Sequence, residues 1–160
     1  MGAHCHHDSH AGGLASAALA SALTEADTRA GAAGERMTPP RRRVLELLLS
    51  AGEPVKAYDL IARFGEDGQA AKPPTVYRAL EFLERLGLAH RIASISAYVA
   101  CSSGEGSHAA AFLICDCCGS TEEVSTTSGA DFGLDVGSSG FAIERTTIEA
   151  HGRCPACQAA

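Results

Sequence analysis

The chain has 160 residues, enough for one domain of ordinary size or for two small ones. Hydrophobic residues make up 46% of it, which excludes the intrinsically disordered class, and the absence of Trp leaves Leu, Val, Ile and Ala to build the core. No apolar run is long enough to span a bilayer and no signal-peptide pattern opens the chain, so we expect a cytoplasmic protein without membrane contact.

The formal net charge of −6 is unevenly distributed. Residues 38–100 hold nine Lys or Arg against seven Asp or Glu, whereas residues 101–160 hold two against eight. Residues 1–37 hold two against four. A mildly basic middle between acidic flanks permits a contact surface for a nucleic acid without requiring one.

The N-terminal segment 1–13, MGAHCHHDSHAGG, is a His-rich tail that we expect to be flexible. It offers a weak extra zinc site, a metal-delivery tail or simply a disordered segment, through His4, Cys5, His6, His7 and His10. Helix formers over 14–27 predict a short helix, and RAGAAGERM, 29–37, predicts a loop.

The middle of the chain predicts three helices. Thr38 is a candidate N-cap, and the prolines and leucine run after it predict a helix over 39–50. A second short helix fits 56–65, which Gly65 closes. A third fits 73–86, where apolar residues repeat at helical spacing opposite a polar face. The apolar stripe is Val76, Leu80 and Leu83, and the polar face is Arg78, Glu81 and Arg85.

Two short β-like runs, 88–93 and 96–100, follow these helices and predict a hairpin. Three helices followed by a two-stranded hairpin is the order of a winged helix-turn-helix, whose third helix enters the DNA major groove. We therefore predict a winged-helix DNA-binding domain over 14–100. The alternative is a small helical domain whose polar third-helix face is merely solvated.

The Gly/Ser stretch 101–107 predicts a hinge. Beyond it we expect strands over 110–115 and 121–125, a short helix within 127–140 and a longer strand over 141–150. The predicted fold class is thus α+β, with an N-terminal winged helix-turn-helix domain and a small α/β domain over 108–160.

Two Cys-x-x-Cys pairs frame this second domain. Two residues between cysteines let both sulfurs bind one metal from a tight turn, and four thiolates complete a closed tetrahedral zinc site that stabilises structure. The alternative is a pair of redox dithiols. The four candidates are Cys115, Cys118, Cys154 and Cys157.

A second candidate set surrounds the predicted hinge. Imidazole, thiolate and carboxylate groups are all accepted zinc ligands, and a site with ligands on both sides of a hinge would link metal binding to domain orientation. Taken singly, such residues are more often ordinary core or turn residues. The set is His90, Cys101, His108 and Glu123, with Glu122 as a competitor for the last place.

The motifs AKPPTVYRALEFL, LAHRI, YVAC, ICDCCG and EAHGRCPAC occur in this order from about residue 37 to the C-terminus. Together they closely resemble the zinc uptake regulator branch of the ferric uptake regulator family. The resemblance implies a winged-helix domain joined to a C-terminal dimerisation domain, and a homodimer that binds a palindromic operator in double-stranded DNA when it is loaded with metal. It also implies a repressor of zinc-uptake genes, with no enzyme activity and no small-molecule substrate.

Carried over residue by residue, the resemblance implies two zinc ions per monomer. It assigns the four cysteines of the paired motifs to a structural zinc, and His90, Cys101, His108 and Glu123 to a regulatory zinc. The DNA contacts are expected on the third helix and at its start, from Lys72, Thr75, Tyr77 and Arg78, because Arg suits a bidentate contact with guanine.

Some features depart from the family pattern. Residues 126–140 are short and Gly-rich where the family carries a longer helix. His151, beside the final Cys-x-x-Cys pair, either hydrogen-bonds a metal ligand or is a turn residue, and Cys117 is an extra thiol. An iron or peroxide sensor of the same family is less favoured, because a thiolate at Cys101 favours zinc. A zinc enzyme of the deaminase type is disfavoured, because the chain does not contain the H-x-E…P-C-x-x-C motif order of such enzymes.

Overall fold

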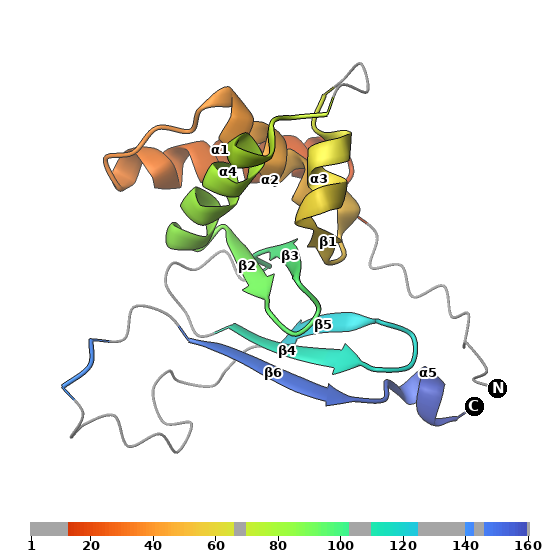
Figure 1. Cartoon of the computed structure of the whole chain (residues 1–160). Helices are drawn as coiled ribbons and strands as arrows, with labels where there is room; N and C mark the ends of the chain where they lie inside the picture. The colour runs from red at the N-terminus through yellow and green to blue at the C-terminus, as the bar shows by residue number, and fades with distance from the viewer. Residues whose placement is uncertain (1–12, 66–69, 103–109, 125–139, 143–145, 160) are drawn as a thin grey trace. The chain divides into compact units, whose positions relative to one another are not determined.

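The computed structural model describes residues 13–65, 70–102, 110–124, 140–142 and 146–159. It contains two compact units (Figure 1). The N-terminal unit holds helices α1–α4 and strands β1–β3, and the C-terminal unit holds strands β4–β6 and helix α5. The structure is therefore of mixed helix and sheet, as the sequence predicted.

The N-terminal unit is built on four helices, α1 (Ser16–Ala32), α2 (Pro39–Ala51), α3 (Ala57–Arg63) and α4 (Pro73–Arg85). Prolines stand in the first turns of α2 and α4, where the missing amide hydrogen costs no hydrogen bond. The predicted stripe of α4, Val76, Leu80 and Leu83, is buried at 0–1% exposure. This stripe packs into one core with residues of the other helices. The polar face of α4 is left exposed by this packing, as predicted.

The wing is a three-stranded antiparallel sheet of order β1-β3-β2. Its strands are β1 (Val55–Lys56), β2 (Ala89–Ile92) and β3 (Ala97–Ala100). The hairpin β2–β3 pairs Ala89 with Ala100 and His90 with Val99. The two-residue strand β1, which the sequence did not predict, pairs Val55 with Tyr98. Helices followed by this wing confirm the predicted winged helix-turn-helix.

Helix α1 is longer than the sequence predicted. The segment 29–32 was predicted as loop, yet α1 continues to Ala32. Ala30 is fully buried there, and Arg29 Nη1 donates to the carbonyl of Gly87 at 3.2 Å, so tertiary packing outweighs the weak helix preference of the glycine at 31. Thr38 is the N-cap residue of α2 as predicted, but its side chain makes no cap hydrogen bond.

The C-terminal unit is a three-stranded sheet of order β5-β4-β6, followed by one short helix. Strand β4 (Ala110–Cys115) pairs antiparallel with β5 (Thr121–Val124) and parallel with β6 (Thr147–Gly152). Helix α5 (Pro155–Gln158) was not predicted. Strand β6 begins at Thr147, where its pairing with β4 starts opposite Ala110. This is later than the predicted start at 141, and residues 141 and 142 are not in a strand.

Several predictions fall outside the described residues. These are the tail at 1–12, most of the hinge, His108, and the helix expected within 127–139. In the part of the chain that the structure describes, no helix is long and apolar enough to cross a membrane.

Candidate zinc centres and DNA-contacting helix

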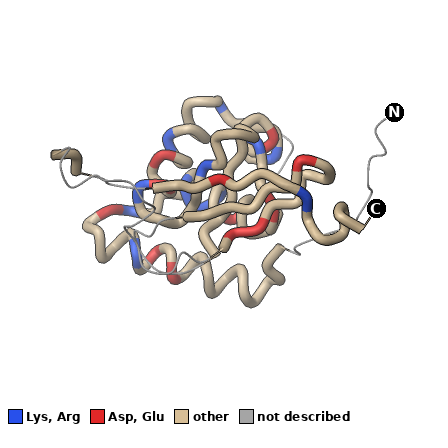
Figure 2. Tube along the Cα trace, turned by 90° about the horizontal axis from the view of Figure 1, so that it is seen from below, with Lys and Arg blue, Asp and Glu red and all other residues tan. Residues whose placement is uncertain are grey.

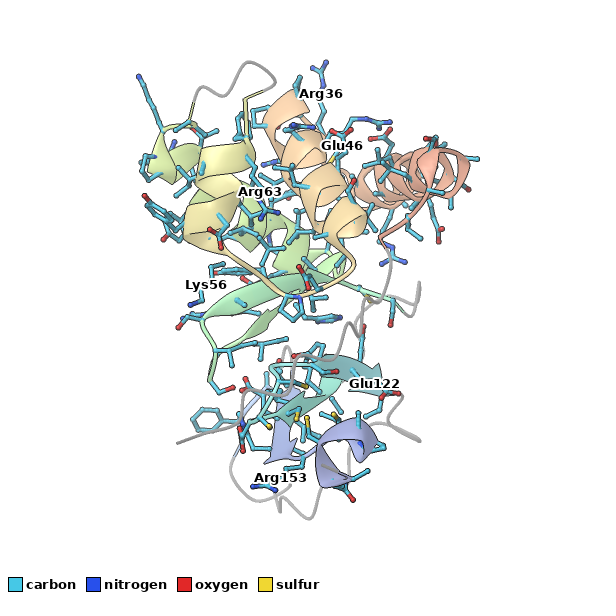
Figure 3. All side chains as sticks on the ribbon, turned by 90° about the vertical axis from the view of Figure 1, so that its right-hand side faces the viewer. Arg36, Glu46, Lys56, Arg63, Glu122 and Arg153 are labelled. Atoms are coloured by element: carbon cyan, nitrogen blue, oxygen red, sulfur yellow. The ribbon has the colours of Figure 1, made fainter. Side chains whose placement is uncertain are left out.

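Four cysteine sulfurs converge at one end of the C-terminal sheet. Cys115 ends β4, Cys118 follows in the turn before β5, Cys154 is the N-cap residue of α5 and Cys157 lies within α5. Their sulfur atoms all lie within 4.8 Å of one another. Figure 3 shows the sulfur atoms gathered beside α5 in this unit.

The first pair of cysteines is held by a tight turn. Gly119 N donates to the Cys115 carbonyl at 2.9 Å, and Cys115 N donates to the Ser120 carbonyl at 2.8 Å. Gly119 has φ +76°, a left-handed conformation that residues with a Cβ adopt at a cost. This conformation turns the chain directly after Cys118, and the Cys115 and Cys118 sulfurs lie within 4.8 Å of each other.

The second pair is brought to the first by the parallel pairing of β4 with β6. In this register Cys115 lies opposite Gly152, and Asp116 N donates to the Gly152 carbonyl at 2.9 Å. The chain then enters α5, where Cys157 N donates to the Cys154 carbonyl at 3.0 Å. Two segments that are 36 residues apart in sequence, at Cys118 and Cys154, thus share one site.

The backbone prepares the site for a cation. The amides of Cys118 and Cys154 point at the Cys115 sulfur and lower the pKa of that thiol to about 6, with Cys154 N at 3.3 Å from Sγ. Burial raises the pKa of the Cys157 thiol, because a lone thiolate would be poorly solvated there. A divalent cation offsets that cost, since it deprotonates a coordinating thiol.

The sulfur positions fit a tetrahedral zinc site. Four ligands at about 2.3 Å from zinc place neighbouring sulfurs about 3.8 Å apart. Cys118 Sγ and Cys154 Sγ are 3.7 Å apart, far longer than a disulfide bond of about 2.05 Å. The arrangement therefore matches a closed site of four thiolates, which stabilises structure and leaves no open position for a substrate.

Two members of the second candidate set meet in the wing. His90 lies in the middle of β2, and Cys101 directly follows β3, where its amide donates to the Leu88 carbonyl at 3.0 Å. Their ligand atoms lie within 4.8 Å of each other. The antiparallel hairpin brings together two residues that are eleven positions apart, which their sequence spacing alone does not reveal.

The other members belong to the C-terminal unit. His108 lies outside the described residues. Glu123 on β5 is opposite the buried Phe112 of β4, whereas Glu122 is opposite the exposed Leu113. Glu123 is itself half-buried and Glu122 is exposed. Successive residues of a strand point to opposite faces, so only one of these two carboxylates can serve a given site.

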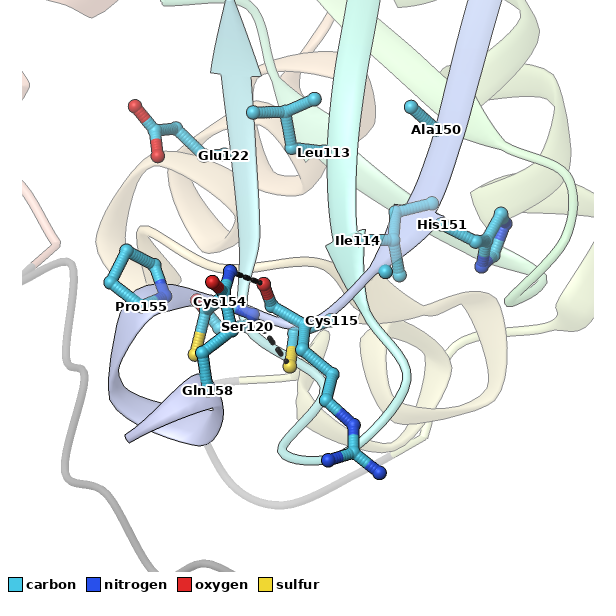
Figure 4. Close-up of a pocket in the computed structure, with 12 residues that line it drawn as sticks. Leu113, Ile114, Cys115, Ser120, Glu122, Ala150, His151, Cys154, Pro155 and Gln158 are labelled. Carbon is cyan, nitrogen blue, oxygen red and sulfur yellow. Dashed lines mark hydrogen bonds between the residues drawn. The ribbon is translucent and has the colours of Figure 1, made fainter. Parts of the chain in front are cut away.

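A pocket of about 310 Å³ lies beside the four-cysteine cluster, lined by residues of β4, β6 and α5 (Figure 4). His151 lines it, and its Nδ1 lies 2.9 Å from Asp116 Oδ1. His151 thus joins the approach to the second cysteine pair to the residue that directly follows Cys115. The sequence did not single out Asp116 as its partner, because the pairing depends on the parallel β4–β6 register.

The exposed side of α4 carries the predicted DNA contacts. Tyr77 is 46% exposed, Arg78 and Lys72 are exposed, and Thr75 is half-buried. Arg78 forms no ion pair with any residue in the described part of the chain. Tyr58, at the start of α3, is 78% exposed. The sequence could have indicated Tyr58 as an aromatic residue outside the buried stripe of its helix.

Charges of both signs are interleaved along the described trace, as Figure 2 shows in blue and red. Net charge therefore cannot by itself define a contact surface. The predicted contact surface rests instead on α4, where Tyr77 and Arg78 are consecutive in sequence and both exposed.

Comparison with known proteins identifies relatives of this chain. A sequence model of the ferric uptake regulator family matches residues 32–151. The zinc uptake regulation protein of Escherichia coli (strain K12) is 38% identical over 137 residues, which cover 84% of this chain and 80% of that protein. The zinc uptake regulation protein of Mycobacterium tuberculosis (strain H37Rv) is 31% identical over 131 residues, covering 79% and 98%.

Solved structures agree with these matches. A structure described as a zinc uptake regulator complexed with zinc and DNA has a TM-score of 0.73 at 36% identity, covering 88% of this chain and 95% of its own. A structure described as holo XcZur has a TM-score of 0.70 at 39% identity, covering 88% and 99%.

Proposed function

Because the chain belongs to the ferric uptake regulator family, we propose that it is a zinc-responsive transcriptional repressor that binds a palindromic DNA operator as a zinc-loaded homodimer. The genes under its control are those for zinc uptake. It acts in the cytoplasm, where its DNA lies, and it is a regulator rather than an enzyme.

Two zinc ions per monomer have separate roles in this proposal. The structural zinc is held by the four cysteines of the C-terminal unit, whose convergence within 4.8 Å supports the assignment. A site with four thiolate ligands is closed to substrates, so its role is to hold the two Cys-x-x-Cys pairs together.

The regulatory zinc is the signal. The single observation that carries this role is the proximity of the His90 and Cys101 ligand atoms in the wing. His108 and Glu123, from the C-terminal unit, complete the set in the proposal. Zinc would then favour the relative orientation of the two units in which all four ligands converge, and it can do so only to the extent that it binds that orientation more tightly.

The thiolate of Cys101 separates this function from the alternatives. Iron sensing favours imidazole and carboxylate ligands, whereas a thiolate favours zinc over harder cations. An iron- or peroxide-responsive regulator of the same family is therefore the second candidate. A small zinc enzyme is disfavoured, because an enzyme needs an open coordination position and both proposed ligand sets have four members.

DNA recognition is assigned to α4. Arg78 reads a guanine through two hydrogen bonds, and Tyr77 contacts a thymine methyl or a phosphate. Thr75 and Lys72, at the start of the helix, contact the phosphate backbone. In a homodimer the two α4 helices would meet two half-sites of a palindrome.

Cys101→Ser tests the zinc switch. The variant should remain a folded dimer but should lose most of the zinc dependence of operator binding in a gel-shift titration with zinc. Cys117→Ser is the matched control, since it removes a thiol that belongs to neither proposed ligand set. Full retention of zinc-dependent binding by Cys101→Ser would overturn the proposed switch.

A further inference from the structure

One cluster in the N-terminal unit lies around the C-terminal half of α4, whereas the proposed DNA contacts lie between its N-cap residue Lys72 and Arg78. Its centre is Phe82, whose side chain is 2% exposed. Arg41 Cζ of α2 lies 3.6 Å from the centroid of this ring, and Arg85 Cζ of α4 lies 5.5 Å from it. Both guanidinium groups thus lie within the range of a cation–π interaction with one ring.

A single carboxylate bridges the two cations. Arg85 Nη1 donates to Glu35 Oε1 at 2.5 Å, and Arg41 Nη1 lies 3.9 Å from Glu35 Oε2. Two guanidinium groups at one ring repel each other, and Glu35 offsets this repulsion because each of its oxygens faces one of them. We call the cluster of Glu35, Arg41, Phe82 and Arg85 the α4 clamp.

The backbone fixes Glu35 in this place. Its amide donates to the Ala30 carbonyl at 2.9 Å, and the preceding Gly34 has φ +71°, so the chain turns sharply after α1. Arg29, at the end of α1, donates to the Gly87 carbonyl just beyond α4. The end of α1 and the turn after it therefore hold the C-terminal end of α4 at two points.

The residues proposed to read DNA, Tyr77 and Arg78, lie in the N-terminal half of α4, and Arg78 stands one turn before Phe82. A helix of 13 residues is about 20 Å long and moves as a nearly rigid rod. A change in how its C-terminal end is held therefore changes the angle at which Tyr77 and Arg78 meet a base pair. Base readout by a bidentate Arg depends on that angle, whereas contact with phosphate tolerates it.

We propose that Glu35 is a positioning residue for DNA recognition: through Arg41 and Arg85 it fixes the orientation of α4, and it contributes to sequence selectivity without touching DNA. This inference rests on the proposed function. Its first consequence, that Glu35 restrains the end of α4, holds in the absence of DNA and can be measured separately.

The test compares Glu35→Gln with Glu25→Gln. Both remove one negative charge, but Glu25 is exposed on α1 and lies outside the α4 clamp. Amide hydrogen exchange is measured first on the zinc-loaded protein without DNA. Affinity is then measured at one salt concentration for a duplex selected by the zinc-loaded protein from a random library, and for a scrambled duplex of the same composition.

Glu35→Gln should speed amide exchange in the last turn of α4, whereas Glu25→Gln should not. Partly exposed ion pairs contribute little, so the affinity ratio of the selected to the scrambled duplex should fall only about two- to five-fold in Glu35→Gln. In Glu25→Gln both affinities should rise together and the ratio should stay constant. Glu35→Asp, which keeps the charge, should recover part of the ratio.

Two results would overturn the inference. Equal exchange in the two Gln variants would show that Glu35 does not restrain α4. Faster exchange in Glu35→Gln with an unchanged ratio would show that the restraint has no effect on recognition. If the unsubstituted protein selects no duplex in the presence of zinc, the proposed function fails, and the exchange comparison still decides whether the α4 clamp holds the helix.

Discussion

At the scale of single residues, the segment 115–118 contains three cysteines, and the structure distinguishes one of them. Cys115 and Cys118 join the cluster with Cys154 and Cys157, while Cys117 is not among the four sulfurs that lie within 4.8 Å of one another. The spacing of the two Cys-x-x-Cys pairs pointed to the same four residues. That they bind zinc stays a prediction.

Replacing Cys118 and Cys117 separately tests whether the four clustered cysteines bind zinc. Cys118→Ser should lower the zinc content by one equivalent and unfold the C-terminal unit, because metal binding supplies about 10 kcal/mol or more to small zinc domains. Cys117→Ser should change neither property. Metal analysis and thermal unfolding of the two variants give the comparison, and equal zinc loss in both would contradict the ligand assignment.

Arg78 carries the prediction about base readout. Arg78→Ala should weaken binding to a selected duplex by about 1–3 kcal/mol and should affect a scrambled duplex much less. Its side chain is exposed and outside the core, so the free energy of unfolding should hardly change. An equal loss on both duplexes in fluorescence anisotropy would assign Arg78 to phosphate contact instead.

At the scale of elements, the sequence predicted those whose apolar spacing is regular. Helices α2, α3 and α4 were expected within one or two residues of their observed bounds, since each buries a stripe at helical spacing. The end of α1, strand β1 and the start of β6 were not, because they depend on contacts distant in sequence. The buried Ala30, the pairing of Val55 with Tyr98 and the parallel register of β4 with β6 are examples.

The same limit applies to the candidate sites. The four-cysteine cluster could be proposed from spacing, since a Cys-x-x-Cys turn is local. The pairs His90 with Cys101 and His151 with Asp116 depend on strand register. The first pair was proposed from ligand types around the predicted hinge, and the resemblance to a known family assigned it to a regulatory zinc. Nothing in the sequence indicated that Glu35 would bridge Arg41 and Arg85.

Gly119 gives a prediction for the turn between β4 and β5. A Cβ added at Gly119 would meet no atom within 4 Å, but the φ of +76° is left-handed. Gly119→Ala should therefore destabilise the zinc-loaded C-terminal unit by about 1–2 kcal/mol. Gly31→Ala also enters open space, within α1, and should instead stabilise by about 0.5–1 kcal/mol. Thermal unfolding of both variants shows whether the sign differs, and a stabilising Gly119→Ala would contradict the role of this turn.

At the scale of the whole molecule, the two proposed zinc sites should differ in how they release metal. The four-cysteine cluster is partly buried and is proposed to be a closed site, whereas the proposed regulatory set takes two ligands from each unit. We expect two equivalents of zinc per monomer, of which mild chelation removes one together with operator binding, while the fold remains. Metal analysis and gel shift on the same samples check this, and a single tightly held equivalent with unchanged DNA binding would contradict it.

The parallel pairing of β4 with β6 also has a consequence for chain entropy. It places Cys118 beside Cys154, so a metal at this point closes a loop of 36 residues. By the relation used for disulfide cross-links, such a closure removes about 4 kcal/mol of conformational freedom from the unfolded chain. Because that cost grows only with the logarithm of loop length, doubling the enclosed segment would change it by only about 0.6 kcal/mol. The stretch between the two Cys-x-x-Cys pairs can therefore gain or lose residues during evolution, while the metal cross-link keeps nearly its full stabilising effect on the fold.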